Sequence, residues 1–242
     1  MAIRRYLAMT AAEFQGGEDV PGYIPAWMAC HFSPYGSGLT NLPGHLPQGG
    51  LLILNDWFAL EGHDSSRVAE QLSQVVESFA CPSVLLDFQR LETPGLRELA
   101  AYLSQALPCP AVVPANLADG LDCPVFLPPC PHHIPLKKYI APWLGRELWL
   151  DMALDAETVT VTEEGSIFSP GEIPEKTACI HRDKILCCHY CQEVTSDQVQ
   201  FQLWRTGEDL EDLSRCAQEL GIHALVGLYL ELCPQNAKAV LL

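Results

Sequence analysis

Lysine and arginine are scarce in this sequence, which has 14 of them against 30 aspartate and glutamate residues, so its formal net charge is −16. Such a chain repels phosphate backbones and anionic membrane surfaces, so we expect neither nucleic acid nor a membrane among its partners. No apolar run approaches the ~18 residues that a membrane span needs. The N-terminal segment turns acidic at Glu13, too soon for a secretory signal. These features predict a cytoplasmic protein.

Three common motifs are also absent from the sequence. It has no Gly-x-Gly-x-x-Gly fingerprint, no Walker A loop and no Gly-x-Ser-x-Gly elbow. Their absence argues against the commonest nucleotide-binding and acyl-transfer sites. We therefore expect no cofactor.

Cysteine, in contrast, is plentiful, and several of the 11 residues lie inside apolar stretches, where a reduced thiol serves as a small hydrophobic side chain. One group combines the side-chain types that bind zinc: Cys179, His181, Cys187, His189 and Cys191. On a strand, residues 187, 189 and 191 would share one face. Reduced and partly buried thiols account for the same residues, and we expect no metal site.

The length and the composition suit one large hydrophobic core. Hydrophobic residues make up 48% of the 242 residues, a length close to the ~250 residues typical of one (β/α)8 barrel. We therefore expect residues 1–242 to form a single barrel domain.

Apolar runs alternate with helical patterns along the chain, which favours parallel strands joined by helices. Eight strands are predicted, at residues 6–10, 24–33, 51–54, 84–87, 111–116, 125–127, 147–152 and 223–230. Helices are predicted to start near Asp64 and Pro94, the proline lying in a first turn, and over residues 135–144 and 208–220. We expect an α/β fold of the (β/α)8 TIM type, with some short or missing helices. A β-hairpin insertion is predicted at about residues 184–205, before the last helix and strand.

The stretch from Cys81 to Arg90 carries the strongest functional signal. Residues 84–86 are apolar and run directly into Asp87, as in a strand that is buried on both faces and ends in a polar side chain. In (β/α)8 barrels the functional site is built at this end of the strands. Asp87 is therefore the first candidate catalytic residue.

This stretch resembles the strand-four signature of family 18 glycoside hydrolases, the chitinase-like barrels, which reads Asp-x-x-Asp-x-Asp-x-Glu. Aligned on Asp87, the positions of the first two acids hold Pro82 and Leu85. Gln89 takes the place of the terminal Glu, which is the family's proton donor. Residues 190–230 are similar, in the order and spacing of their elements, to the last portion of the spore-cortex-type members. The resemblance implies a TIM barrel that is degenerate at the catalytic motif.

In that family the Glu protonates the leaving oxygen while the acid two residues before it steadies the attacking acetamido group. Gln89 cannot donate a proton in that way, because an amide only forms hydrogen bonds. Leu228 or Tyr229 stands where the family has a Trp, and Pro128-Pro129 replaces a Tyr-Asp pair. The resemblance thus implies a barrel that lacks the standard chemistry and binds an N-acetylated carbohydrate or a protein partner at its mouth.

Two alternatives remain open at this stage. Four acids end predicted strands and are candidate catalytic residues: Asp56, Asp87, Asp151 and Glu231. Two of them could face each other as the carboxylate pair of an active glycosidase. Alternatively they cap helices or hold loops in a non-catalytic structural or interaction protein.

Further side chains near the predicted strand ends are candidates for binding the substrate: Gln89, Asn55, Asn116, His31, Tyr35, Trp57 and Tyr229. The amide groups can hydrogen-bond to sugar hydroxyls, and the aromatic rings can stack on sugar faces or pack at the rim. Parallel strands put their carboxyl ends together, so we expect the strand-end acids and amides at one end of the barrel. The sequence contains no indication of the oligomeric state.

Overall fold

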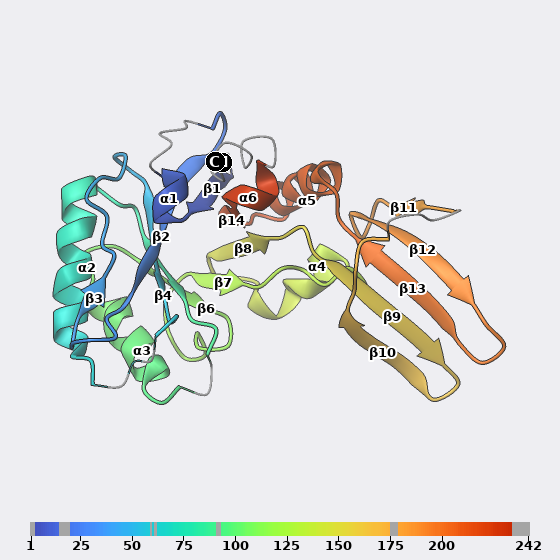
Figure 1. Ribbon diagram of the computed structural model, residues 1–242, viewed down its shortest axis with the longest axis horizontal. Coiled ribbons are helices and arrows are strands. Elements are labelled where there is room, and N and C mark those ends of the chain that lie inside the picture. The colour runs from blue at the N-terminus through green and yellow to red at the C-terminus, as the bar shows by residue number, and fades with distance from the viewer. Residues whose placement is uncertain are drawn as a thin grey trace. The chain divides into compact units, whose positions relative to one another are not determined.

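The computed structural model describes residues 3–14, 20–58, 60, 62–90, 93–174 and 179–233 (Figure 1). Packing divides the chain into two compact units. Unit 1 comprises Met1–Pro128, Arg146–Asp151 and His223–Leu242, and unit 2 comprises Pro129–Gly145 and Met152–Ile222. The single-domain organisation stays a prediction.

Unit 1 is built on a closed barrel of eight parallel strands, which confirms the predicted fold class. Its strands are β1 (Arg4–Met9), β2 (Ile24–Phe32), β4 (Leu51–Asn55), β5 (Val84–Asp87), β6 (Ala111–Pro114), β7 (Val125–Leu127), β8 (Leu148–Met152) and β14 (Ala224–Leu228). The sheet runs β1-β14-β8-β7-β6-β5-β4-β2, and pairing of β1 with β2 closes it. The short strand β3 (Leu39–Thr40) pairs antiparallel with β2.

The interior of the barrel is filled with side chains from one face of each strand. Tyr6 stacks on Trp149 with ring centroids 5.2 Å apart and nearly parallel planes. The Arg4 guanidinium lies over the same indole at 5.2 Å, and the indole Nε1 donates to Glu147 at 2.9 Å. The inner core is therefore a packed aromatic and aliphatic cluster, as expected for a barrel of this size.

Two amphipathic helices pack side by side on the outside of the barrel, α2 (Ser65–Phe79) and α3 (Leu96–Ala106) (Figure 1). Asp64 caps α2, as predicted, by accepting the Ser66 N–H at 2.9 Å. The start of α3 differs from the prediction: Gly95, with φ +85°, is its N-cap residue, so Pro94 lies before the helix. The β2–β4 connection contains no helix, as its Gly- and Pro-rich sequence indicated, and the β6–β7 connection contains none because it is too short. The short helix α1 (Ala11–Phe14) follows β1.

The closing strand is shorter than predicted. β14 ends at Leu228, and Tyr229 begins the short helix α6 (Tyr229–Leu232). The Tyr229 side chain packs with Leu7 and Met9 in a second hydrophobic cluster, so the chain turns where this ring becomes buried.

Unit 2 contains a five-stranded antiparallel sheet in the order β10-β9-β13-β12-β11. Its strands are β9 (Ala156–Thr162), β10 (Gly165–Pro170), β11 (His181–Asp183), β12 (Cys188–Val194) and β13 (Val199–Trp204). The predicted hairpin is the β12–β13 pair. The other three strands extend this hairpin into the five-stranded sheet. Unit 2 also holds α4 (Leu136–Tyr139), the 3-10 helix η1 (Ala141–Trp143) and α5 (Gly207–Glu219).

Candidate functional site

The candidate site follows from the alternation of side chains along the barrel strands. Ile53, Leu85 and Trp149 belong to the inner core of the barrel. Residues two positions further along a strand face the same side. The inner face therefore carries three polar side chains at the carboxyl ends of β4, β5 and β8: Asn55, Asp87 and Asp151.

Asp87 and Gln89 interact directly at the end of β5. The Gln89 Nε2 donates a hydrogen bond to Asp87 Oδ1 at 3.1 Å, and Asn55 is the register partner of Asp87 on β4. Burial raises the pKa of Asp87, the Gln89 hydrogen bond opposes the rise, and the nearby Asp56 carboxylate adds to it. Asp87 is half-buried and Gln89 is exposed, so the pair can present both a donor and an acceptor to a ligand.

Asp56 has a different environment from Asp87. It is only 5% exposed, and its two carboxylate oxygens accept the backbone N–H groups of Gln89 at 3.0 Å and Arg90 at 2.7 Å. The carboxylate therefore clamps the segment that carries the Gln89 side chain. The sequence left two interpretations of the strand-end acids, a catalytic carboxylate pair or acids that cap helices and hold loops. The contacts of Asp56 agree with the second.

Two other candidates, Asn55 and His31, are held by hydrogen bonds with backbone groups. Asn55 donates from Nδ2 to the Met28 carbonyl at 2.8 Å and accepts the Trp57 N–H at 3.1 Å. His31 Nδ1 donates to the Phe32 carbonyl at 2.9 Å. These contacts fix both side chains near the ends of β2 and β4.

The candidate aromatic residues differ sharply in exposure. Tyr35 is 97% exposed and Trp57 is 70% exposed, so both rings are open to a ligand, whereas Tyr229 is 2% exposed in its hydrophobic cluster. Asn116 is exposed two residues after β6. Glu231 lies in α6, three residues after β14, because the closing strand ends early.

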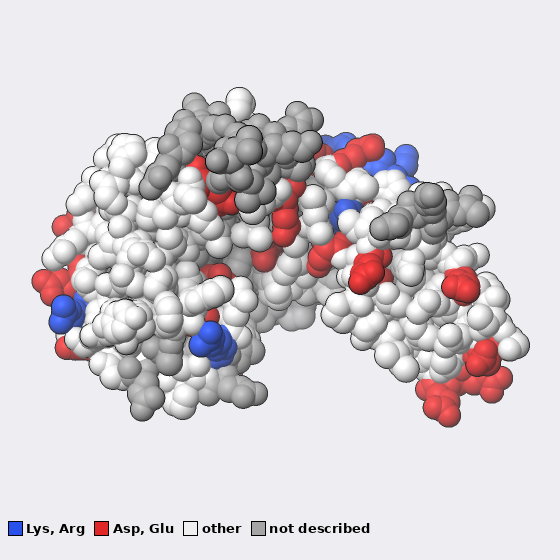
Figure 2. Space-filling view, in the orientation of Figure 1, with Lys and Arg blue, Asp and Glu red and all other residues white. Residues whose placement is uncertain are grey.

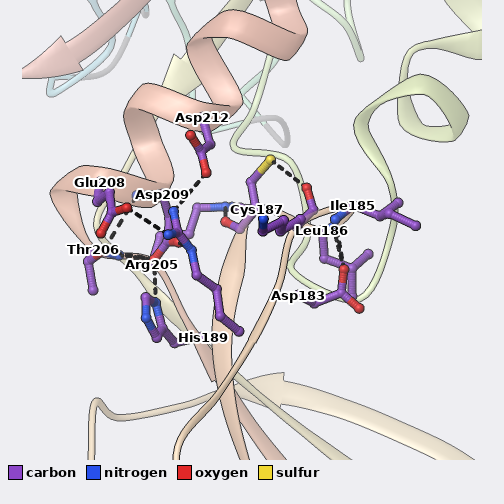
Figure 3. Close-up of polar contacts among 12 residues, drawn as sticks. Asp183, Ile185, Leu186, Cys187, His189, Arg205, Thr206, Glu208, Asp209 and Asp212 are labelled. Carbon is purple, nitrogen blue, oxygen red and sulfur yellow. Dashed lines mark hydrogen bonds and ion pairs between the residues drawn. The ribbon is translucent and has the colours of Figure 1, made fainter.

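A cluster that sequence reasoning missed lies in unit 2 around Asp209, which is fully buried (Figure 3). Its carboxylate accepts hydrogen bonds from the Thr206 N–H at 2.9 Å, the Thr206 hydroxyl at 2.8 Å, His189 Nδ1 at 2.6 Å and Arg182 Nε at 3.0 Å. Arg182 also pairs with Glu208 and Asp212, each at 2.7 Å. The Thr-x-x-Asp spacing was the available signal, because it is typical of a capping box.

The Cys/His group does not form a metal site among the residues that the structure describes, where no three His, Cys, Asp or Glu side chains are placed to hold an ion. Cys188 and Cys191 have the Cys-x-x-Cys spacing, but residues three apart on a strand face opposite sides. Cys187 instead approaches Cys216 of α5, with the two sulfurs 3.9 Å apart. Burial raises the pKa of Cys187 to about 12, so the thiol stays protonated at neutral pH.

The fold and the strand-end side chains define unit 1 as a TIM-type barrel with its candidate site at the carboxyl ends of the strands. No protein-family model and no curated protein matches the sequence. Solved structures do match, and they include chitinases and spore cortex-lytic enzymes.

Three of these structures illustrate the likeness. The spore cortex-lytic enzyme SleL from Bacillus cereus has a TM-score of 0.56 at 8% identity, and the match covers 99% of this chain and 74% of that one. The Group IV chitinase of Ostrinia furnacalis has a TM-score of 0.58 at 8% identity, over 93% and 92% of the two chains. A mutant GH18 chitinase from Cycas revoluta in complex with (GlcNAc)4 has a TM-score of 0.57 at 11% identity, over 98% and 97%. The chain therefore has the barrel fold of glycoside hydrolase family 18 structures.

Proposed function

We propose that this chain is a glycoside-hydrolase-like barrel that binds an N-acetylated glycan at the carboxyl end of its strands and does not hydrolyse it by the family 18 route. The observation that carries the proposal is the 3.1 Å hydrogen bond between Asp87 and Gln89. Asp87 and Gln89 stand at the two positions where the family 18 signature has Asp-x-Glu.

The chemistry of the pair favours binding over hydrolysis. A carboxylic acid can protonate a leaving oxygen, whereas the Gln89 amide only donates or accepts hydrogen bonds. Asp87 keeps an acceptor beside that amide, and Asn55 lies next to it in register. Trp57 supplies an exposed ring after β4 for stacking on a sugar face.

One of the similar structures supports the same proposal. The Cycas revoluta chitinase that holds (GlcNAc)4 carries two substitutions, one of which replaces a Glu with a Gln. A barrel of this fold with such a replacement can therefore hold a chito-oligosaccharide.

A glycosidase that uses another carboxylate pair is the second candidate. Burial raises the pKa of Asp87, and the Asp56 charge adds to the rise, as suits a general acid. Of the other three candidate acids, Asp151 is the one that lies on the same inner face as Asp87 at the carboxyl end of a barrel strand, so it is the favoured partner. This candidate requires turnover that is lost in both Asp87→Asn and Asp151→Asn.

The two candidates are separated by measuring binding and turnover together. Titration with (GlcNAc)4 and with peptidoglycan fragments should raise the unfolding free energy by about 2.7 kcal/mol at ~100 times the dissociation constant. No reducing ends should be released. Asp87→Ala should abolish the stabilisation, while Glu77→Ala, which removes an exposed acid from α2, should leave it unchanged.

The reciprocal substitution tests the assignment of Gln89. Gln89→Glu restores the proton donor and should produce detectable hydrolysis of an N-acetylated substrate. Turnover by the unmodified protein would instead support the glycosidase. If neither the unmodified protein nor any variant binds or cleaves a glycan, the interpretation as an interaction protein remains.

A further inference from the structure

The sheet of unit 2 ends in an unusually open strand. β10 is the outer strand at one side of the sheet and pairs with β9, its neighbour among the described residues. All six of its residues are exposed. Edge strands present backbone N–H and C=O groups that can pair with another chain.

The opposite edge of the same sheet is built differently. β11 has three residues, and all of them are ionisable: His181, Arg182 and Asp183. Short length and charge are the usual devices that prevent an edge from pairing with another strand. β10 is twice as long, has no charged side chain over residues 165–170, and carries its one proline, Pro170, at the last position, so the rest of the strand has none of these devices.

The side chains of β10 are suited to contact with an added strand. Ile167 is 63% exposed and Phe168 is 49% exposed, and because they are adjacent they project from opposite faces of the sheet. Phe168 stacks on His133 with centroids 4.0 Å apart, and Glu157 accepts from His133 Nδ1 at 2.7 Å. The strand is therefore supported from within unit 2 while its outer edge stays accessible.

Acidic residues flank both ends of the open edge. Glu163 and Glu164 form the exposed turn before β10, and Glu172 is exposed shortly after it. Figure 2 shows acidic side chains gathered at the far end of the β9–β10 hairpin. An occupant with Lys or Arg at its ends would complement this charge.

We propose that β10 is a docking edge that takes an extended, basic segment of a partner protein as an added strand. Main-chain hydrogen bonds would supply the affinity, and Ile167 and Phe168 would contact apolar side chains of the segment. A second copy is disfavoured by charge: antiparallel pairing of β10 with itself, centred on Phe168, places Glu164 of one copy opposite Glu172 of the other. The interaction is independent of the proposed glycan site.

Selection of binders from a random dodecapeptide phage library tests this proposal. We expect the selected peptides to combine β-prone residues with Lys or Arg near their ends. Ile167→Lys should weaken their binding by about tenfold or more, because a charge now occupies the edge. Thr160→Lys is the matched control: Thr160 is the register partner of Ile167 on β9, so the same charge is added one strand away from the edge and should have little effect.

Hydrogen exchange gives a second readout. The bound peptide should protect backbone amides within residues 166–169, and a version of the peptide N-methylated at alternate residues should not bind. Equal loss of binding in both Lys variants, or no selected binder, would overturn the proposal. Sedimentation showing dimers that Ile167→Lys dissociates would assign the edge to a second copy instead.

Discussion

At the scale of single residues, the two acids near the ends of β4 and β5 make different contacts, although both follow apolar strands. Asp87 lies on the inner face, where its carboxylate meets the Gln89 side chain. Asp56, one residue beyond the inward-facing Asn55, turns its carboxylate to the backbone of the next loop. One position along a strand changes the face of the side chain, and here it separates a side chain of the candidate site from a loop clamp.

The clamp leads to the first residue-scale prediction. Asp56→Ala removes the acceptor of two backbone N–H groups and should lower the unfolding free energy by about 2 kcal/mol. Amide exchange at Gln89 and Arg90 should become faster. Asp64→Ala, which removes an exposed helix cap, is the control and should cost about 1 kcal/mol without changing exchange at those two residues. Unchanged exchange in Asp56→Ala would show that the loop does not need the clamp.

At the scale of elements, α5 is tied to β11 and β12 by its first turn. Thr206 and Asp209 form a reciprocal capping box, and the same carboxylate binds Arg182 and His189. A buried carboxylate satisfied by four donors is an effective link between elements, because the loss of any partner leaves buried charge.

The pH dependence of this link can be predicted with its sign. Burial alone would raise the pKa of Asp209, but the hydrogen bonds from Thr206 and His189 lower it below the usual value. A lowered folded-state pKa means that the carboxylate stabilises the fold above the unfolded value of about 3.9, and that this contribution is lost as the pH falls through the folded-state pKa. In Asp209→Asn, the unfolding free energy should therefore depend less on pH in the acid range than it does in the unmodified protein.

The size of the effect is checked by denaturant unfolding at several pH values. At pH 7, Asp209→Asn should cost about 2 kcal/mol, because Arg182 keeps Glu208 and Asp212 as partners. Glu208→Gln alters an exposed pair and should cost less than about 1 kcal/mol. An equal decrease in the unfolding free energy of the two variants would contradict the role of Asp209 as the buried helix cap.

At the scale of the whole molecule, the two units differ in the size of their cores. The barrel strands β4, β5 and β6 are almost entirely buried, whereas the cluster within the sheet of unit 2 is built around three buried residues: Val159, Cys188 and Leu203. Local stability follows buried apolar contact. We expect backbone amides in β9, β10 and β13 to exchange faster than those in β4–β6.

Hydrogen exchange followed by mass spectrometry measures this difference directly. Leu85→Ala, in the barrel core, should cost about 2–5 kcal/mol and accelerate exchange throughout the barrel. Ile167→Ala removes an exposed side chain and should leave the barrel unchanged. Equal protection of the two sheets would show that the whole chain unfolds as one cooperative unit.

Much of the barrel was determined by the sequence alone. Apolar runs of β-prone residues ending in Asp87 or Asn55 predict buried parallel strands, and the spacing of apolar residues after Asp64 predicts α2, because burial on both faces or on one stripe requires those patterns. The hairpin of β12 and β13 followed from two β-prone runs on either side of a polar turn. The carboxyl-end position of Asp87 and Asn55 followed from parallel strands as well.

Only the tertiary structure decided what each polar side chain contacts. The clamp formed by Asp56, the burial of Tyr229 and the convergence of Arg182 and His189 on Asp209 each join residues that are distant in sequence or turned by one position. The pairing of β9 with both β10 and β13, which makes β10 an open edge, is likewise set by register between separate segments. Local patterns fix the period of an element, whereas partners across the fold depend on packing that no single stretch encodes.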